Sequence, residues 1–187
     1  TGEGAHIDSA LFDTSLAILA NQASNALVSG QDPPRQGNTH PNIVPYQPFA
    51  CADQPLIIAV GNDRQFAKLA TILGAPEWAA DERFATNAAR VANRATLIPL
   101  IAGRLRERPA ADWFAELDAA GIPAGPINTV SQALSDPQAA YREMVQHMDH
   151  FRLVGSPLRL DGERADADRA PPKLGEHTDE VLAEILD

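Results

Sequence analysis

Apolar residues near the start of the chain recur at every third or fourth position, a spacing that predicts an amphipathic helix. One apolar stripe contains Phe12, Leu16, Leu19, Ala23 and Leu27. Three more apolar residues, at positions 7, 11 and 18, lie off that stripe. We therefore predict one long helix over residues 7–28, ended by Gly30, and a helix that is apolar on two sides needs partners on two sides.

A strand-like pattern follows the loop after this helix and predicts a β-hairpin. Its strands cover residues 49–52 and 56–60, and the turn between them runs Asp53-Gln54-Pro55. Helical periodicity then returns. The three main helices predicted from it cover residues 63–73, 87–106 with a bend at Pro99, and 110–120. In the last of these, Trp113, Phe114 and Leu117 are predicted to share a face that lies in the core.

The last third of the chain alternates between short helices and strands. Its predicted elements are a strand and turn at 123–130, helices that end at Leu134 and about Arg142, two strands between 143 and 160, and a final helix at 178–186. Charged residues such as Asp166 and Asp168 predict a linker without buried regular structure at 161–172. Few strands and many helices place the chain in the α/β or α+β class.

Composition excludes several classes of function. The chain has 187 residues, 44% hydrophobic and 21% charged, as in an ordinary soluble globular protein. Its net charge of −10 argues against general binding to nucleic acid or anionic membranes, since both need clustered positive charge. The apolar run at 16–20 is too short to span a membrane. Cys51 is the only cysteine, so no internal disulfide forms, and its strand-like surroundings predict a buried structural thiol.

The proline-rich loop before the hairpin contains the strongest candidate chemistry. Arg35 offers a planar fork for a phosphate or carboxylate. Gly37 and Asn38 permit unusual backbone angles and the close approach of a ligand. His40 and Tyr46 can hydrogen-bond to a thioester oxygen or a bound acid. From the residues alone, a structural crossing segment whose polar groups only satisfy its own backbone stays equally open.

Two other clusters have plainer interpretations. The run His147-Met-Asp-His150 contains two imidazoles and a carboxylate, but on a strand its histidines face opposite sides, so a solvated strand end is favoured over a metal site. Arg83, Arg90 and Arg94 could form a basic face, but acidic residues adjoin Arg83, which favours a salt-bridged helix surface. The chain has no Gly-x-Ser-x-Gly elbow, which argues against a self-contained hydrolase.

Several blocks of polar, glycine and proline residues follow a pattern that core packing does not require. The first block begins Arg35-Gln-Gly-Asn-Thr-His40, and the others are residues 57–66, 81–94, 120–128, 136–145 and 171–182. In this order the blocks resemble the C-terminal half of the family III CoA-transferases, also called the CaiB/BaiF family. The resemblance covers nearly the whole chain.

The resemblance implies an α/β fold, with an α+β small domain and segments that complete a Rossmann-like large domain. It implies that residues 1–30 are a connecting helix, that 31–130 are the small domain, and that 131–187 return to the large domain. It also implies a cytoplasmic protein in which two chains interlock as a homodimer. The N-terminal half of the same protein would then provide most of the coenzyme A site.

The family moves coenzyme A between carboxylic acids, so the implied partners are an acyl-CoA and a carboxylic acid. Coenzyme A is then a substrate, and neither a cofactor nor a metal is expected. The family's nucleophile is an aspartate that forms mixed-anhydride and aspartyl-CoA thioester intermediates. The resemblance places this aspartate upstream of Thr1, so no catalytic residue is assigned within the chain. The 187 residues alone are predicted to be inactive, and either to self-associate or to expose an apolar patch.

The same resemblance implies that the loop carrying Arg35 lines the active-site cleft. Two alternatives to a transferase stay open. One is a racemase of the same family, which epimerises the carbon beside the thioester. The other is a non-catalytic dimerisation or regulatory module. The acyl group and the acceptor acid cannot be read from these residues.

Overall fold

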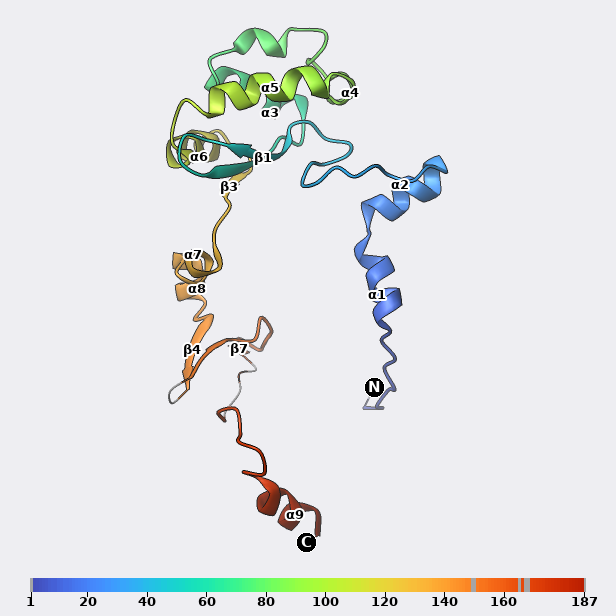
Figure 1. The fold of residues 1–187 in the computed structure, drawn as a ribbon, viewed down its shortest axis with the longest axis vertical. Coiled ribbons are helices and arrows are strands. Elements are labelled where there is room, and N and C mark those ends of the chain that lie inside the picture. The colour runs from blue at the N-terminus through green and yellow to red at the C-terminus, as the bar shows by residue number, and fades with distance from the viewer. Residues whose placement is uncertain (1, 149–150, 165, 167–168, 187) are drawn as a thin grey trace. The chain divides into compact units, whose positions relative to one another are not determined.

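The computed structural model describes residues 2–148, 151–164, 166 and 169–186 (Figure 1). The chain divides into two compact units, Thr1–Pro126 and Ile127–Asp187. Both units contain helices and strands, which confirms the predicted α/β class. The first unit contains α1 (Leu11–Ile18), α2 (Asn21–Ser29), β1 (Tyr46–Ala50), β2 (Pro55–Ala59), α3 (Asp63–Ile72), the short 3-10 helix η1 (Pro76–Ala79), α4 (Asn87–Ala92), α5 (Arg94–Leu105), α6 (Ala110–Ala119) and β3 (Ala124–Pro126).

The first unit is built on a three-stranded antiparallel sheet in the order β1-β2-β3. β1 pairs with β2 so that Phe49 lies opposite Leu56, which confirms the predicted hairpin, although β1 begins earlier than predicted. β3 pairs with the other edge of β2 and sets Leu56 opposite Pro126. Along β2, Leu56 and Ile58 are buried whereas Ile57 is 37% exposed, so one face of the sheet lies in the core.

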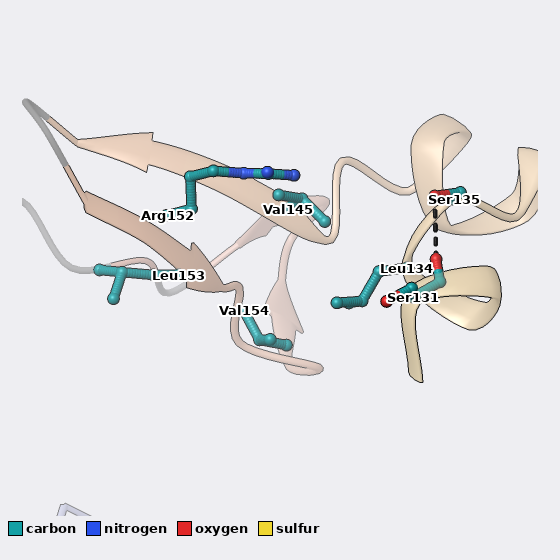
Figure 2. Close-up of a pocket in the computed structure, with 7 residues that line it drawn as sticks. All are labelled: Ser131, Leu134, Ser135, Val145, Arg152, Leu153 and Val154. Atoms are coloured by element: carbon teal, nitrogen blue, oxygen red, sulfur yellow. Dashed lines mark hydrogen bonds between the residues drawn. The ribbon is translucent and has the colours of Figure 1, made fainter. Parts of the chain in front are cut away.

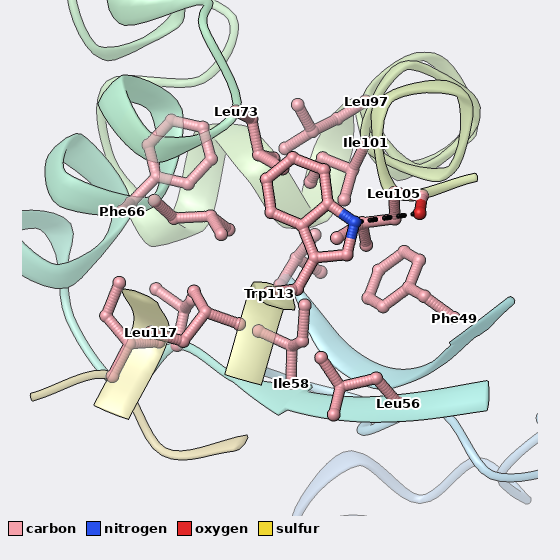
Figure 3. Close-up of a cluster of buried hydrophobic side chains, with 14 of the residues drawn as sticks. Phe49, Leu56, Ile58, Phe66, Leu73, Leu97, Ile101, Leu105, Trp113 and Leu117 are labelled. Carbon is pink, nitrogen blue, oxygen red and sulfur yellow. Dashed lines mark hydrogen bonds between the residues drawn. The ribbon is translucent and has the colours of Figure 1, made fainter. Parts of the chain in front are cut away.

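The hydrophobic core lies between this sheet and the helices α3, α5 and α6 (Figure 1). The helical side contributes Phe66 and Leu69 from α3, Leu73 directly after α3, Leu97, Ile101 and Leu105 from α5, and Trp113 and Leu117 from α6 (Figure 3). Trp113 and Leu117 are buried as predicted, but Phe114 is 37% exposed, so its predicted place in the core is wrong. Consecutive residues of a helix are rotated by about 100° around the helix axis. The side chain next to a core-facing tryptophan therefore points toward the edge of the core.

The helix predicted over residues 87–106 is two helices, and the break lies at Asn93 rather than at Pro99. The Asn93 side chain donates one hydrogen bond to the Ala89 carbonyl at 2.9 Å and another to the Arg83 carbonyl at 3.3 Å. An asparagine that binds nearby carbonyls competes with the helical ladder. The predicted bend at Pro99 is therefore wrong in position, and Pro99 lies within α5.

The single helix predicted over residues 7–28 is also two helices. Ala20, between α1 and α2, has φ 44° and ψ −112°, which no helix accommodates. Gly30 ends α2 in the left-handed conformation, as predicted. The apolar side chains of α1 are exposed, with Leu11 at 87% and Phe12 at 72%. Among the helices of the described residues, none has the length and apolarity needed to cross a membrane.

Asp53, in the turn of the hairpin, fixes the start of α6. Its Oδ1 accepts hydrogen bonds from the backbone N–H of Gln54 and of Ala110, each at 2.8 Å. The Ala110 N–H is one of the donors that the first turn of a helix leaves without a helical partner. The hairpin turn therefore caps a helix that lies far along the sequence.

Acid should weaken this cap. The hydrogen bond from Ala110, and then that from Gln54, hold the pKa of the Asp53 carboxyl below its ordinary value, which is about 3.9. A folded-state pKa below the unfolded one means that the carboxylate stabilises the fold at neutral pH, and that this stability is lost as the pH falls through the folded pKa. We expect Asp53→Ala to lower the thermal midpoint at pH 7, and the difference from wild type to narrow below about pH 4. Asp53→Asn, which keeps an acceptor oxygen, is the control, and a difference that is constant with pH would contradict the assignment.

In the second unit, the residues that the structure describes form two small antiparallel hairpins and three helices. Its elements are α7 (Val130–Leu134), α8 (Pro137–Tyr141), β4 (Val145–Met148), β5 (Phe151–Val154), β6 (Arg159–Leu160), β7 (Glu163–Arg164) and α9 (Thr178–Leu186). β7 lies within the predicted linker of residues 161–172, so regular structure is present there, although neither residue of β7 is in the buried class. Asp161 has φ 51° and Gly162 has φ 90°, the left-handed conformations of a tight hairpin turn. The Asp-Gly pair was the sequence signal for this hairpin.

Candidate functional site

The loop between α2 and β1 is tied to the sheet at its end. The His40 N–H donates to the Tyr46 carbonyl at 2.9 Å, and the Val60 N–H donates to the Pro45 carbonyl at 2.9 Å. The His40 and Tyr46 rings stack, with centroids 5.2 Å apart and planes 10° apart. The backbone N–H of Asn42 donates to His40 Nδ1 at 3.1 Å. The structure therefore brings two of the predicted site residues, His40 and Tyr46, into direct contact.

The other predicted site residues lie on the exposed part of the loop. Arg35 and Asn38 are exposed, and Arg35 forms no hydrogen bond or ion pair with the residues that the structure describes. Gly37 has φ 58°, which explains a glycine there, and a Cβ added at this position would meet no atom within 4 Å. Gly37 thus shapes the turn, and the guanidinium of Arg35 is available to a ligand.

Two side chains from the α4–α5 region hold this loop. Asn87 Nδ2 donates to the Asn42 carbonyl at 2.8 Å, and Asn87 Oδ1 accepts from the Val44 N–H at 3.2 Å. Arg94 Nη2 donates to the carbonyls of His40 at 2.7 Å and Pro41 at 2.9 Å. Sequence reasoning missed both contacts. The only signal was the block of residues 81–94, whose polar positions recur at helical spacing.

Arg90, another polar residue of this block, is fully buried. Its Nε donates to the Val44 carbonyl at 2.7 Å, and its Nη1 donates to the Phe84 carbonyl at 2.9 Å. Its Nη2 pairs with Asp63 at 2.8 Å. Burial lowers the pKa of the guanidinium, and the contact with Asp63 opposes that effect; arginine stays charged in either case.

The prediction of a salt-bridged helix surface is therefore wrong for Arg90 and Arg94. Arg83 is exposed and pairs with Asp81 at 2.6 Å, as predicted, but it lies in a turn before α4 and not on a helix. Arg90 and Arg94 instead donate to backbone carbonyls of segments that are distant in the sequence. The sequence shows the charged residues but not these carbonyl acceptors, because only the folded chain brings the acceptors next to the arginines.

A pocket of about 350 Å³ adjoins the candidate loop. Its walls come from α2 and from residues 31–42, and they are rich in side-chain amides, including Gln22, Asn25 and Asn42. Gln36 Oε1 also lies in this wall, buried and without a hydrogen-bond partner among the described residues. The volume is at the lower end of the range of small-molecule sites, about 300–1,000 Å³.

A second pocket, of about 360 Å³, lies within the second unit (Figure 2). It is lined by Ser131, Leu134, Ser135, Val145, Arg152, Leu153 and Val154. The hydroxyl of Ser135 donates to the Ser131 carbonyl at 2.9 Å. The proton of that hydroxyl is therefore already bound at the C-terminal end of α7. None of the predicted site residues lines either pocket, but the first pocket is lined by chain neighbours of Arg35 and His40, so the candidate site stays with the loop of the first unit.

The cysteine and the histidine cluster add no chemistry to this site. Cys51 is half-buried against the core, and burial, followed by the charge of Asp53, raises the pKa of its thiol. A raised pKa leaves less of the reactive thiolate at neutral pH. In the histidine cluster, Asp149 and His150 lie outside the described residues. Within the described ranges, no three histidine, cysteine or acidic side chains gather as metal ligands.

Comparison with known sequences adds independent evidence. The model of CoA-transferase family III matches residues 1–178. A succinate–glutarate CoA-transferase of Agrobacterium fabrum is 42% identical over 99% of this chain and 48% of its own length. An acetyl-CoA:oxalate CoA-transferase of Acetobacter aceti is 38% identical over 94% of this chain and 46% of its own length.

A similar structure is also known. The crystal structure of a CaiB/BaiF family protein from Brucella suis superposes with a TM-score of 0.80 and 49% identity. The match covers 98% of this chain and 49% of the other. The chain therefore spans about half the length of the relatives that it matches.

Proposed function

The chain belongs to CoA-transferase family III, and from this premise we propose that the protein carrying it moves coenzyme A between two dicarboxylic acids. The resemblance found in the sequence blocks is confirmed by the family match and by the Brucella suis structure. One relative is named for succinate and glutarate, both dicarboxylic acids, and the other for acetyl-CoA and the dicarboxylic acid oxalate. Coenzyme A enters this reaction as a thioester substrate.

The observation that carries this proposal is the ordered loop of the first unit. His40 and Tyr46 are stacked, α4–α5 side chains fix the backbone between these two residues, and an exposed Arg35 lies earlier on the same loop. A guanidinium suits the free carboxylate of a dicarboxylic acid because it can bind both oxygens. We assign Arg35, Gly37, Asn38, His40 and Tyr46 to substrate binding, with Gly37 setting the turn.

The chemistry that this site serves is acyl transfer through a carboxylate. In the proposed sequence, an aspartate from the N-terminal half attacks the thioester and releases the coenzyme A thiolate, which leaves a mixed anhydride. The thiolate then attacks the aspartyl carbonyl and releases the donor acid. The acceptor carboxylate attacks the resulting aspartyl thioester, which releases the thiolate and leaves a second mixed anhydride. The thiolate then attacks the acyl carbonyl of the acceptor, which forms the acyl-CoA product and frees the aspartate. No residue of this chain is assigned as the nucleophile.

The same proposal extends to the assembly. Residues 1–30 connect to the large domain, 31–130 form the small domain, and 131–187 return to the large domain. The exposed apolar side chains of α1 support this view, since they need a cover that the first unit does not supply. We propose that the N-terminal half and a second copy of the chain cover them, in a cytoplasmic homodimer.

The test is steady-state transfer from succinyl-CoA to glutarate by the complete protein. We expect Arg35→Ala to lower kcat/KM for glutarate roughly tenfold to a hundredfold, because a charged hydrogen bond to a carboxylate contributes about 1.5–3 kcal/mol. The thermal midpoint should not change, since Arg35 is exposed. Arg83→Ala, another exposed arginine, is the matched control and should leave turnover unchanged.

Three outcomes would contradict these proposals. Wild-type kinetics in Arg35→Ala would remove this residue from the substrate site. Deuterium exchange at the carbon beside the thioester without coenzyme A transfer would identify a racemase. Absence of turnover with every dicarboxylic acid pair would support the non-catalytic alternative.

A further inference from the structure

The hydrogen bond between Asn42 and His40 determines where the histidine proton lies. A neutral imidazole has one nitrogen that donates and one that accepts. His40 Nδ1 accepts from the Asn42 backbone N–H at 3.1 Å, so the ring proton is on Nε2. Within the described part of the chain, no group accepts a hydrogen bond from that Nε2. The donor is therefore available to a ligand.

We propose that His40 serves the transfer reaction as a neutral hydrogen-bond donor through Nε2–H, and that Arg94 and Asn87 are the positioning residues that hold it in this state. The proposal rests on the proposed function. A thioester oxygen gains negative charge when its carbonyl carbon is attacked, and a fixed N–H donor stabilises that charge. His40 is not a general base in this arrangement, because Nε2 already carries a proton and Nδ1 is occupied.

One peptide unit connects Arg94 to the imidazole. The peptide between Pro41 and Asn42 is trans, so its C=O and its N–H point in opposite directions. Arg94 Nη2 binds the carbonyl at 2.9 Å, and the N–H on the other side binds His40 Nδ1. The guanidinium thus sets the orientation of the peptide and polarises it, which strengthens its N–H as a donor.

The carbonyls on either side of this peptide are held as well. Arg94 Nη2 also binds the His40 carbonyl at 2.7 Å, and Asn87 Nδ2 binds the Asn42 carbonyl at 2.8 Å. Three successive carbonyls, from His40 to Asn42, therefore have partners on α4 and α5. Rotation of the peptide away from His40 would break these contacts together. Stacking on Tyr46 fixes the plane of the ring.

The first experiment compares two amides at position 40 in the complete protein. The terminal amide of glutamine reaches the place of Nε2, whereas that of asparagine reaches only the place of Nδ1. We expect His40→Ala and His40→Asn to lower kcat for transfer from succinyl-CoA to glutarate about a hundredfold, the loss typical of one removed oxyanion donor. His40→Gln should stay within about tenfold of wild type. Asparagine performing as well as or better than glutamine would overturn the proposal.

The second experiment asks whether Arg94 acts through His40. We expect Arg94→Ala to lower kcat about tenfold with little change in KM for succinyl-CoA, and Arg94→Lys to recover part of the loss. The double variant Arg94→Ala with His40→Ala should be no slower than His40→Ala alone, since two members of one unit do not add. Additive losses would overturn the positioning role. Arg83→Ala again serves as the control.

A spectroscopic measurement separates this inference from the proposed function. Proton–nitrogen correlation spectra of the complete protein, labelled with nitrogen-15 histidine, report which ring nitrogen carries the proton, and His40→Ala assigns the signal. We expect a protonated Nε2 in the wild type and a mixture of tautomers in Arg94→Ala. A proton on Nδ1 in the wild type would overturn the inference even if transfer occurs. A protonated Nε2 in a protein without turnover would support the tautomer and contradict the proposed function.

Discussion

Replacement of Arg90 by methionine is expected to lower the free energy of unfolding of the first unit by about 3–5 kcal/mol. The variant leaves the carbonyls of Val44 and Phe84 without their donor in a buried place. An unsatisfied buried acceptor costs about 1–3 kcal/mol. Loss of the guanidinium over the Phe66 ring, at 4.4 Å, adds to this cost. The half-exposed Asp63 adds little, because water can solvate its carboxylate once the arginine is gone.

Hydrogen exchange in the complete protein measures this loss locally. Backbone amides of β1 and β2 that exchange through unfolding of the unit should do so about 10²–10⁴ times faster in Arg90→Met. Arg83→Met is the matched control, since its ion pair with Asp81 is on the surface and contributes about 0–1 kcal/mol. Exchange rates within about tenfold of wild type would show that Arg90 is dispensable to the fold.

Local patterns predicted those elements whose partners are near in the sequence. The hairpin of β1 and β2 follows from apolar strand segments and a short turn, and both are visible within a dozen residues. The helix predicted at 110–120 from its apolar spacing is confirmed by α6. The hairpin at Asp161 was missed although its signal is local, because the surrounding charges outweighed the Asp-Gly pair in the interpretation.

Elements that depend on long-range contacts were not predictable. Arg90 was assigned to the surface since charged residues are rarely buried, and its acceptor on Val44 lies 46 positions away. Asn93 breaks the helix by donating hydrogen bonds to the Ala89 and Arg83 carbonyls. The spacing of apolar residues does not predict these hydrogen bonds. The bend was predicted at Pro99 because proline lacks a backbone N–H, but α5 continues through Pro99.

The candidate site divides in the same way. Arg35, His40 and Tyr46 were identified by residue type, since an arginine fork and an imidazole in a proline-rich loop suggest a ligand. The sequence did not reveal that the His40 ring lies on Tyr46, nor that Arg94 holds the peptide behind it. The first kind of statement concerns what a residue can do. The second concerns where its neighbours are, and only the fold supplies that.

Trp113→Ala is expected to lower the free energy of unfolding of the first unit by about 3–5 kcal/mol, the usual cost of removing a large buried aromatic side chain. Trp113 is 4% exposed, lies in the core between α5 and the sheet (Figure 3), and has the Arg108 guanidinium 4.2 Å from its ring. Its Nε1 donates to the Leu105 carbonyl at 2.9 Å. That carbonyl belongs to the last residue of α5, where the helix itself supplies no donor, so the indole gives it a partner.

Trp113→Phe separates the two contributions. It keeps most of the buried ring but leaves the Leu105 carbonyl without a donor, so we expect a smaller loss of about 1–3 kcal/mol. Trp78 is only partly buried, and Trp78→Ala is the control that should cost less than Trp113→Ala. The three variants are compared by hydrogen exchange of core amides in the complete protein. Equal losses in Trp113→Ala and Trp113→Phe would assign the effect to the hydrogen bond, whereas no loss in Trp113→Phe would assign it to packing alone.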